Sequence, residues 1–182
     1  MRITPVFKPA DYTGGATDDL TALFDYLRPG EPDPEIDMGH AGVAIAAINP
    51  GVALLMAQLS KAIAMDTGWA KQTDLRELAF YTLNRHFRSD FSVAARKPYW
   101  AIVGISEEQM AAVADWQASP LLSDTQKLVV EYTLATVTAN VTDALFDRVK
   151  TAFGETGAIE FTTLIGFWSC WAMVINAADP EF

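Results

Sequence analysis

SDTQKLVVEYTLATVTA, residues 123–139, is the stretch that decides the fold class. Between Val129 and Val137 it is rich in β-branched side chains, which by composition alone favour a strand. Yet it begins with Ser123 and Gln126 at the spacing of a capping box, in which each side chain bonds to the other residue's backbone N–H at a helix start. The cap therefore predicts a helix over 124–139, and no other stretch shows a sustained period of two.

Most of the chain after residue 16 is also predicted to be helical. Ser106 and Gln109 form a second capping box, ahead of a helix at about 107–117, and Asp74 and Glu77 resemble a third. Helical spacing of apolar residues predicts further helices at about 17–28, 50–65, 74–87, 90–103, 143–153 and 158–177, with a candidate at 40–48. We therefore expect an all-α, single-domain helical bundle over 17–182, preceded by an extended arm at 1–16.

The composition limits what the protein can bind. The chain has 182 residues, of which 51% are hydrophobic, enough to bury a core of its own. Thirteen lysines and arginines against 23 aspartates and glutamates give a net charge of −10, which repels phosphate backbones and anionic lipid surfaces. The sequence therefore predicts neither a nucleic-acid nor a membrane partner, although the short cationic clusters 85–88 and 96–97 could serve a small anionic ligand.

The cysteine content and the apolar segments bear on the compartment. A single cysteine, Cys170, allows no disulfide within the chain and no cluster of thiolate zinc ligands, which favours a reduced, cytoplasmic setting. Residues 1–8 lack the apolar run of a signal peptide. The most apolar stretch, 164–175, is well short of the roughly twenty residues that span a bilayer. We expect that stretch to be a core helix.

Glu77 is the first candidate catalytic residue. It lies in an apolar helix and, by helical spacing, shares a face with Tyr81, Asn84 and Arg85 or Arg88. A carboxylate among apolar neighbours suits a general acid or base, because burial disfavours the charged form of such a group. The alternative is a structural ion pair between this carboxylate and a nearby arginine.

Further candidates lie at the start of the next helix and near Gly39. Ser92 and Arg96 are one turn apart and Ser89 lies one turn earlier, so two hydroxyls and a guanidinium could hold a carboxylate. The alternative there is a helix cap with solvent-facing neighbours. Only two histidines occur, too few for a three-histidine metal site, and we predict no metal. His40 is the better catalytic candidate of the two, since it lies in a Gly- and Ala-rich segment that a ligand could approach closely.

The remaining side chains favour structural roles. Cys170 stands among apolar residues of the last helix, where a thiol behaves as a small hydrophobe, so we do not expect a nucleophile there. The tryptophans are core residues by spacing, but Trp168, with Tyr81, could line a pocket for a flat organic substrate. P-loop, G-x-G-x-x-G and G-x-S-x-G motifs are absent from the sequence, which predicts no cofactor and gives no support for nucleotide or serine-hydrolase chemistry.

Several of these residues together resemble one family. Residues 75–78 (LREL), Asn84, 89–96 (SDFSVAAR) and 104–108 (GISEE) are similar to the core of the carboxymuconolactone decarboxylase and alkylhydroperoxidase D family. Residues 164–168 (LIGFW) and 176–177 add to the likeness, which extends from about residue 17 to residue 179. The resemblance implies an all-helical fold of the alkylhydroperoxidase D type, whose subunits assemble into dimers, trimers or hexamers.

The candidate site departs from both branches of that family. In the peroxidase branch a glutamate and a C-x-x-C-x-x-x-H motif reduce peroxides. Glu77 matches the glutamate, but Ser89 and Ser92 stand at the cysteine positions and Arg96 at the histidine position. A serine hydroxyl forms neither a disulfide nor a sulfenic acid, which excludes thiol peroxidase chemistry. The histidine of the decarboxylase branch is missing as well.

Two functional hypotheses follow, and a third, thiol peroxidase chemistry through Cys170, is disfavoured because one buried thiol lacks a resolving partner. In the first, the chain is a cofactor-independent lyase, isomerase, hydratase or decarboxylase that acts on a small carboxylated or cyclic metabolite. Glu77, together with His40, would move protons, and Arg96, Ser89 and Ser92 would hold the anion. In the second, the chain is a non-catalytic small-molecule-binding or structural oligomeric member of the family. That hypothesis predicts that Glu77 and Arg96 only pair with each other.

Overall fold

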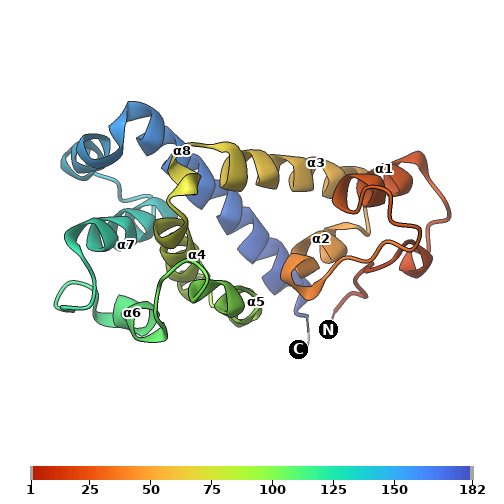
Figure 1. Cartoon of the computed structure of the whole chain (residues 1–182), viewed down its shortest axis with the longest axis horizontal. Helices are drawn as coiled ribbons and strands as arrows, with labels where there is room; N and C mark the ends of the chain where they lie inside the picture. The colour runs from red at the N-terminus through yellow and green to blue at the C-terminus, as the bar shows by residue number, and fades with distance from the viewer. Residues whose placement is uncertain (1, 181–182) are drawn as a thin grey trace. The chain divides into compact units, whose positions relative to one another are not determined.

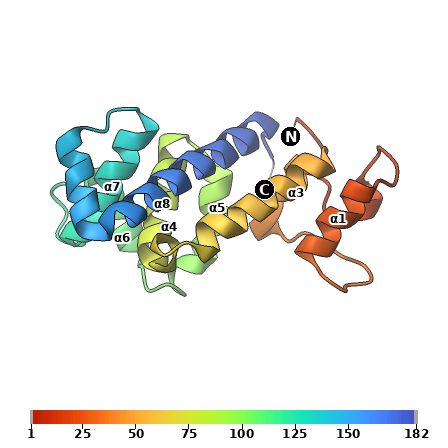
Figure 2. The same ribbon diagram turned by 90° about the horizontal axis from the view of Figure 1, so that it is seen from above.

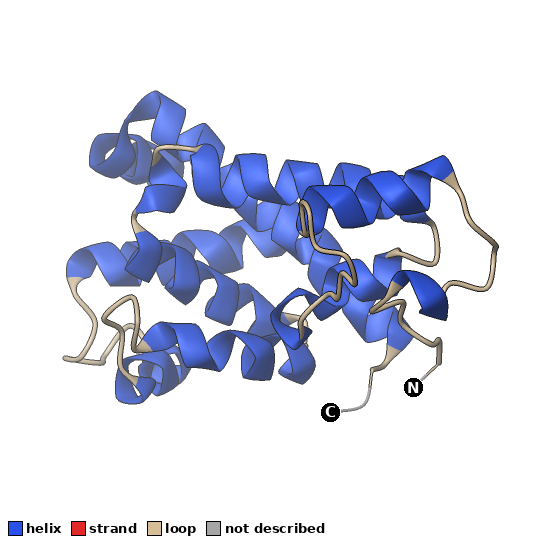
Figure 3. Ribbon diagram, turned by 45° about the vertical axis from the view of Figure 1, so that its right-hand side comes forward, coloured by secondary structure: helices blue, strands red, loops and turns tan. Residues whose placement is uncertain are grey.

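The computed structural model describes residues 2–180, whose regular structure is entirely helical (Figure 3). The α-helices are α1 (Asp18–Leu27), α2 (Ala41–Ala46), α3 (Pro50–Lys61), α4 (Thr73–His86), α5 (Asp90–Trp100), α6 (Glu107–Ala111), α7 (Asp124–Val137) and α8 (Asp143–Ala178). A 3-10 turn, Pro9–Asp11, precedes α1, and further 3-10 turns and a π-helical turn, Ala62–Asp66, lie between the α-helices. Because the described residues contain no strand, the all-α prediction is confirmed.

The contacts divide the chain into two compact units. The first contains the described residues up to Ala62 together with those from Met173 onward, and the second is Ile63–Ala172. In the first unit, α3 packs against both α1 and α2 (Figures 1 and 2). In the second unit, α4 packs against α5 and α7 (Figure 1). The candidate residues on α4 and α5 therefore belong to the second unit.

The N-terminal segment before α1 is irregular apart from the 3-10 turn Pro9–Asp11, and backbone hydrogen bonds join it to other residues of the first unit. The Val6 N–H donates to the Ala44 carbonyl at 2.8 Å, and the Val6 side chain is buried. The Arg2 N–H donates to the carbonyl of Ala178, the last residue of α8, at 2.9 Å. These bonds satisfy backbone groups that an extended segment leaves without helical partners.

Two of the three predicted capping boxes are present. Ser123 and Gln126 exchange side-chain to backbone hydrogen bonds at the start of α7, and Ser106 and Gln109 do the same at α6. Val129 and Val130, in the β-branched stretch behind the first of these caps, are fully buried helical residues. The local cap and burial of the apolar side therefore outweigh the strand preference of the stretch.

The capping arrangement predicted for Asp74 and Glu77 is wrong. α4 begins one residue earlier than Asp74, and its N-cap, Gln72, makes no side-chain cap bond. Glu77 does not turn back toward the helix start, because its carboxylate contacts arginine side chains instead. The spacing of a capping box is present without its hydrogen bonds.

α8 contains the break that separates the last two predicted helices. Gly154 has φ 74° and ψ 170°, a conformation outside the helical region that glycine adopts readily. Beyond it, Phe161, Leu164 and Ile165 are fully buried in the core of the second unit. α8 extends well beyond the apolar stretch 164–175, and by length and composition it could cross a membrane, with 44% of its most apolar window buried. Core helices of soluble proteins pass the same test, so this is weak evidence for a span.

Candidate functional site

Glu77 is fully buried in the second turn of α4 and contacts two arginines. Arg96 Nε donates to Glu77 Oε2 at 3.0 Å, and Arg96 Nη2 donates to Oε1. Arg76 Nη2 donates to the same Oε1 at 3.4 Å. The Arg96 side chain is 25% exposed and that of Arg76 is 12% exposed. The carboxylate is therefore enclosed in a fork of Arg96, with Arg76 beside it.

The turn between α4 and α5 brings Arg96 to Glu77. The Ser89 N–H donates to the Asn84 carbonyl at 2.8 Å, and the Arg88 N–H donates to the Arg85 carbonyl at 3.2 Å. These two bonds form a Schellman motif, which ends α4 with Arg88 in the left-handed region at φ 55°. α5 starts directly behind this turn and packs against α4, so that a residue two turns into α5 faces the buried carboxylate.

Arg76 is a member of the cluster that the sequence analysis did not assign. Consecutive residues of a helix project about 100° apart, so spacing gave no reason to place it beside Glu77. Arg76 Nη1 donates to the Ala64 carbonyl at 2.7 Å and to the Ala70 carbonyl at 3.4 Å. Its buried Nε has no hydrogen-bond partner among the described residues. Burial lowers the pKa of Arg76, and the charge of Arg96 lowers it further against the opposing effect of Glu77.

The two candidate serines bond to each other. Ser89 Oγ and Ser92 Oγ are 2.8 Å apart, and both residues are buried. Ser89 is the N-cap of α5, but its side chain makes no cap bond to the backbone. Ser92 and Arg96 do lie one turn apart on α5, as predicted, whereas the guanidinium binds Glu77. The three side chains predicted to hold a carboxylate therefore lie on or at the start of one helix, but the two hydroxyls bond to each other and the guanidinium bonds to Glu77.

Two aromatic rings contact the Arg96 guanidinium, that of the buried Phe80 and that of the partly exposed Tyr99. The Arg96 guanidinium carbon lies 5.2 Å from the ring centroid of Phe80 and 4.7 Å from that of Tyr99. Phe80 in turn stacks on Trp168, with 4.3 Å between ring centroids. Trp168 therefore contacts Phe80, which contacts Arg96, but no direct cation–π contact of Trp168 with Arg96 is present. Tyr99 contacts Arg96 directly, although helical spacing gave no reason to select it. A flat cation between aromatic faces is a favourable cation–π arrangement.

The other two candidates have different partners. Tyr81 lies edge-on to Trp100 with ring centroids 5.4 Å apart. His40 belongs to the first unit, is largely exposed, and has its Nδ1 2.9 Å from Asp37 Oδ1. Arg28 Nη2 donates to Asp37 Oδ2 at 2.6 Å. Burial alone would raise the pKa of Asp37, but the hydrogen bonds and charges of His40 and Arg28 outweigh it and lower that pKa.

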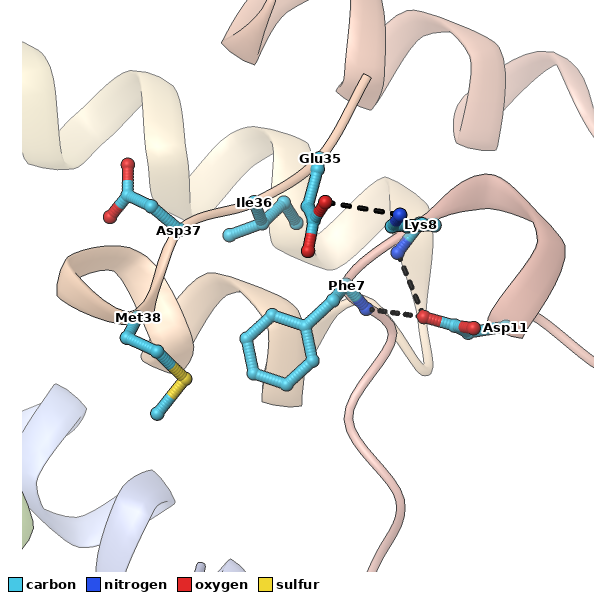
Figure 4. Close-up of a pocket in the computed structure, with 7 residues that line it drawn as sticks. All are labelled: Phe7, Lys8, Asp11, Glu35, Ile36, Asp37 and Met38. Atoms are coloured by element: carbon cyan, nitrogen blue, oxygen red, sulfur yellow. Dashed lines mark hydrogen bonds and ion pairs between the residues drawn. The ribbon is translucent and has the colours of Figure 1, made fainter. Parts of the chain in front are cut away.

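A pocket of about 480 Å³ lies in the first unit (Figure 4). Its lining residues are Phe7, Lys8, Asp11, Glu35, Ile36, Asp37 and Met38. Lys8 Nζ lies 3.1 Å from Glu35 Oε2, and Asp11 Oδ2 accepts from the backbone N–H groups of Phe7 and Lys8. The charged residues that line this pocket already have partners within the chain. In the Glu77 cluster, by contrast, the buried Nε of Arg76 lacks a hydrogen-bond partner among the described residues, so the Glu77 cluster is the better candidate site.

The fold and the cluster define an all-α protein with a buried carboxylate between two arginines. Sequence comparison finds similarity to an uncharacterized protein of Escherichia coli (strain K12), YnjA, with 41% identity over 76 residues. The match covers 41% of this chain and 42% of that protein, so the chain spans less than half the length of this curated relative. No family model matches the chain, and no solved structure matches it significantly.

Proposed function

We propose that the Glu77 cluster binds a small carboxylated or cyclic metabolite, and that Glu77 then acts on it as a general acid or base without a cofactor. The charge balance carries this proposal, because Arg76 and Arg96 bring two positive charges to one buried carboxylate. An unneutralised charge is costly to bury. An anionic ligand would offset that cost, and the buried Nε of Arg76 is a donor that still lacks a partner among the described residues.

The exposed part of Arg96 is where such a ligand would enter. A ligand carboxylate that takes the place of Glu77 on the Arg96 fork keeps two parallel hydrogen bonds and frees the Glu77 carboxylate for proton transfer. The carbon skeleton would then lie against the ring of Tyr99, which is 36% exposed and borders the guanidinium. Proton removal next to a carbonyl is the chemistry that needs the fewest additional groups.

The family and the compartment are part of the same proposal. Glu77 and the spacing Ser89-x-x-Ser92-x-x-x-Arg96 support a divergent member of the carboxymuconolactone decarboxylase and alkylhydroperoxidase D family, and the all-α fold agrees with it. A cytoplasmic location is supported by the single cysteine and by the buried core residues of α8.

The closed ion pair favours a second candidate function, a binding protein without catalysis. Both oxygens of Glu77 accept hydrogen bonds from Arg96, which is the pairing expected of a non-catalytic member. In that case the cluster holds α4 and α5 together, and a ligand contacts Arg96 without releasing Glu77.

A ligand screen on matched variants separates the two candidates. A panel of aromatic acids and lactones is tested by thermal shift, since a ligand of the folded state raises its melting temperature, and each mixture is then analysed by NMR for turnover. We expect Arg96→Met to lose binding and Glu77→Gln to retain binding without turnover. Arg85→Met is the control, because Arg85 forms an exposed ion pair with Asp90. Far-UV circular dichroism first confirms that each variant is folded.

Three outcomes are informative. Turnover that disappears in Glu77→Gln supports the enzyme. Tight binding without turnover, unchanged in Glu77→Gln, supports the binding protein. If every acid leaves the melting temperature of the wild type unchanged, both candidate functions fail at this site.

A further inference from the structure

Arg76 is a largely buried cation with few short hydrogen bonds. Its guanidinium carries five N–H groups, all of them donors. Nη1 donates to the Ala64 carbonyl at 2.7 Å, whereas its bond to the Ala70 carbonyl and the bond from Nη2 to Glu77 are both 3.4 Å long. The buried Nε has no acceptor among the described residues. Since unsatisfied donors of a buried charge are costly, one more oxygen acceptor beside Arg76 would be stabilising.

The sulfur of an exposed methionine lies beside this guanidinium. Met65 Sδ is 3.9 Å from Arg76 Nη1, and Met65 is 59% exposed. Met65 belongs to the π-helical turn Ala62–Asp66, a rare conformation that occurs frequently at functional sites. A thioether sulfur is only a weak acceptor, so the contact satisfies Arg76 poorly. Because the Met65 side chain is open to solvent, a dissolved oxidant can also reach it.

Oxidation of this sulfur replaces a weak acceptor by a strong one. A lone pair of the sulfur attacks one oxygen of hydrogen peroxide, the O–O bond breaks, and a sulfoxide and one water molecule are formed. The sulfur loses two electrons, which the peroxide gains, and the apolar side chain becomes polar. An N–H···O hydrogen bond spans about 2.9 Å. An oxygen added to a sulfur 3.9 Å from Nη1 therefore meets the donor with little movement of either side chain.

We propose that Met65 is a site of reversible oxidation by peroxides, and that Arg76 binds the oxygen of its sulfoxide. Met38 and Met173 are each 54% exposed, but neither sulfur makes a hydrogen bond within the described part of the chain. Their sulfoxides would lie in water without a charged donor. The proposal does not depend on the ligand proposed for Glu77, although Arg76 also donates to Glu77 and so links Met65 to that carboxylate.

Thermal unfolding of oxidised and untreated protein tests the contact. Wild type, Met65→Leu and Met173→Leu are treated with hydrogen peroxide, and mass spectrometry of their peptides measures the oxygen added at each methionine. We expect oxidation to leave the melting temperature of the wild type about 2–4 °C higher than the change in Met65→Leu predicts, the effect of one hydrogen bond in a domain of this size. Met173→Leu is the matched control and should behave like the wild type.

Two arginine variants show whether Arg76 causes the shift. Arg76→Leu removes the donors, so a sulfoxide at Met65 should no longer raise the melting temperature. Arg85→Leu should keep the shift, because Arg85 forms an exposed ion pair with Asp90. Circular dichroism first verifies that both variants are folded. If Arg76→Leu does not fold, the comparison of Met65→Leu with Met173→Leu still decides the proposal.

Four results would overturn the proposal. Equal changes on oxidation of wild type and Met65→Leu show that the sulfoxide has no partner, and a shift that persists in Arg76→Leu assigns its oxygen to another donor. A Met65 that stays unoxidised while Met173 is converted shows that peroxide does not reach its sulfur. Methionine sulfoxide reductases should restore the untreated melting temperature, and a shift that outlasts complete reduction has another cause.

Discussion

Replacing Glu77 by glutamine tests the central ion pair of the site. The change keeps the size of the side chain and removes its charge, which leaves Arg76 and Arg96 close together without a counter-charge. Removing one partner of a buried pair costs about 3–5 kcal/mol. Glu77 has no exposed surface, whereas Arg96 is 25% exposed and recovers part of its hydration. We therefore expect a loss of about 3 kcal/mol in the free energy of unfolding, the lower end of that range.

A double-mutant cycle measures how much of this loss belongs to the pair. Glu77→Gln, Arg96→Met and the double variant are unfolded in urea and followed by circular dichroism, with linear extrapolation to zero denaturant. We expect a coupling energy of about 2 kcal/mol, as for residues that share hydrogen bonds. Asp90→Asn is the control, because it breaks the exposed Arg85–Asp90 pair and should cost less than about 1 kcal/mol.

The reasoning is refuted if Glu77→Gln costs less than about 1 kcal/mol, the range of an exposed pair. It is equally refuted if the effects of the two single variants add within about 0.5 kcal/mol, since independent sites behave in that way. Either result would mean that the carboxylate and the Arg96 guanidinium are separated in solution, and that Arg96 is already free to hold a ligand.

Three further predictions use local features of the chain. Ala139 follows α7 at φ 56°, so Ala139→Gly should raise the free energy of unfolding in urea by about 1 kcal/mol, and a lower value would contradict the left-handed turn. The lowered pKa of Asp37 means that its interactions stabilise the fold above about pH 4 and are lost as the pH falls through the folded-state pKa. The difference in unfolding free energy between wild type and Asp37→Asn should therefore shrink below about pH 4. A difference that stays constant with pH would contradict the lowered pKa of Asp37. The Oγ atoms of Ser89 and Ser92 are 2.8 Å apart, so replacing both by cysteine in a Cys170→Ser background should give a disulfide on oxidation, seen as the loss of both free thiols.

Helix starts could be predicted because they are decided within one turn of the chain. Ser123 and Gln126 need only each other's backbone to form their cap, and the structure contains it. The same pattern fails at Glu77, where arginines from another helix and from the neighbouring position bind the side chain. A local pattern is therefore reliable only while no distant group competes for the same side chain.

Helical spacing alone did not identify the arginines that contact Glu77. Helical spacing offered Arg85 or Arg88 as neighbours of Glu77 on the same helix, whereas the Glu77–Arg96 pair was expected only from the hypothesis of a non-catalytic family member. The structure instead pairs Arg85 with Asp90 and brings Arg96 across from α5. A helical wheel ranks neighbours on one helix only, whereas contacts between α4 and α5 depend on the geometry of the turn that joins them.

Helix α3 shows a related limit of apolar periodicity. The spacing of Val52, Leu55 and Leu59 predicted a helix, and the helix is present, but these residues lie outside the core of the first unit. Periodicity identifies an apolar side, and burial by the same chain or by another molecule removes that side from water equally well. In α3 the small residues Ala53 and Ala57 are buried and let the helix approach its own unit closely, whereas Val52, Leu55 and Leu59 stay exposed. Spacing alone does not rank the two sides of such a helix, because both sides are apolar.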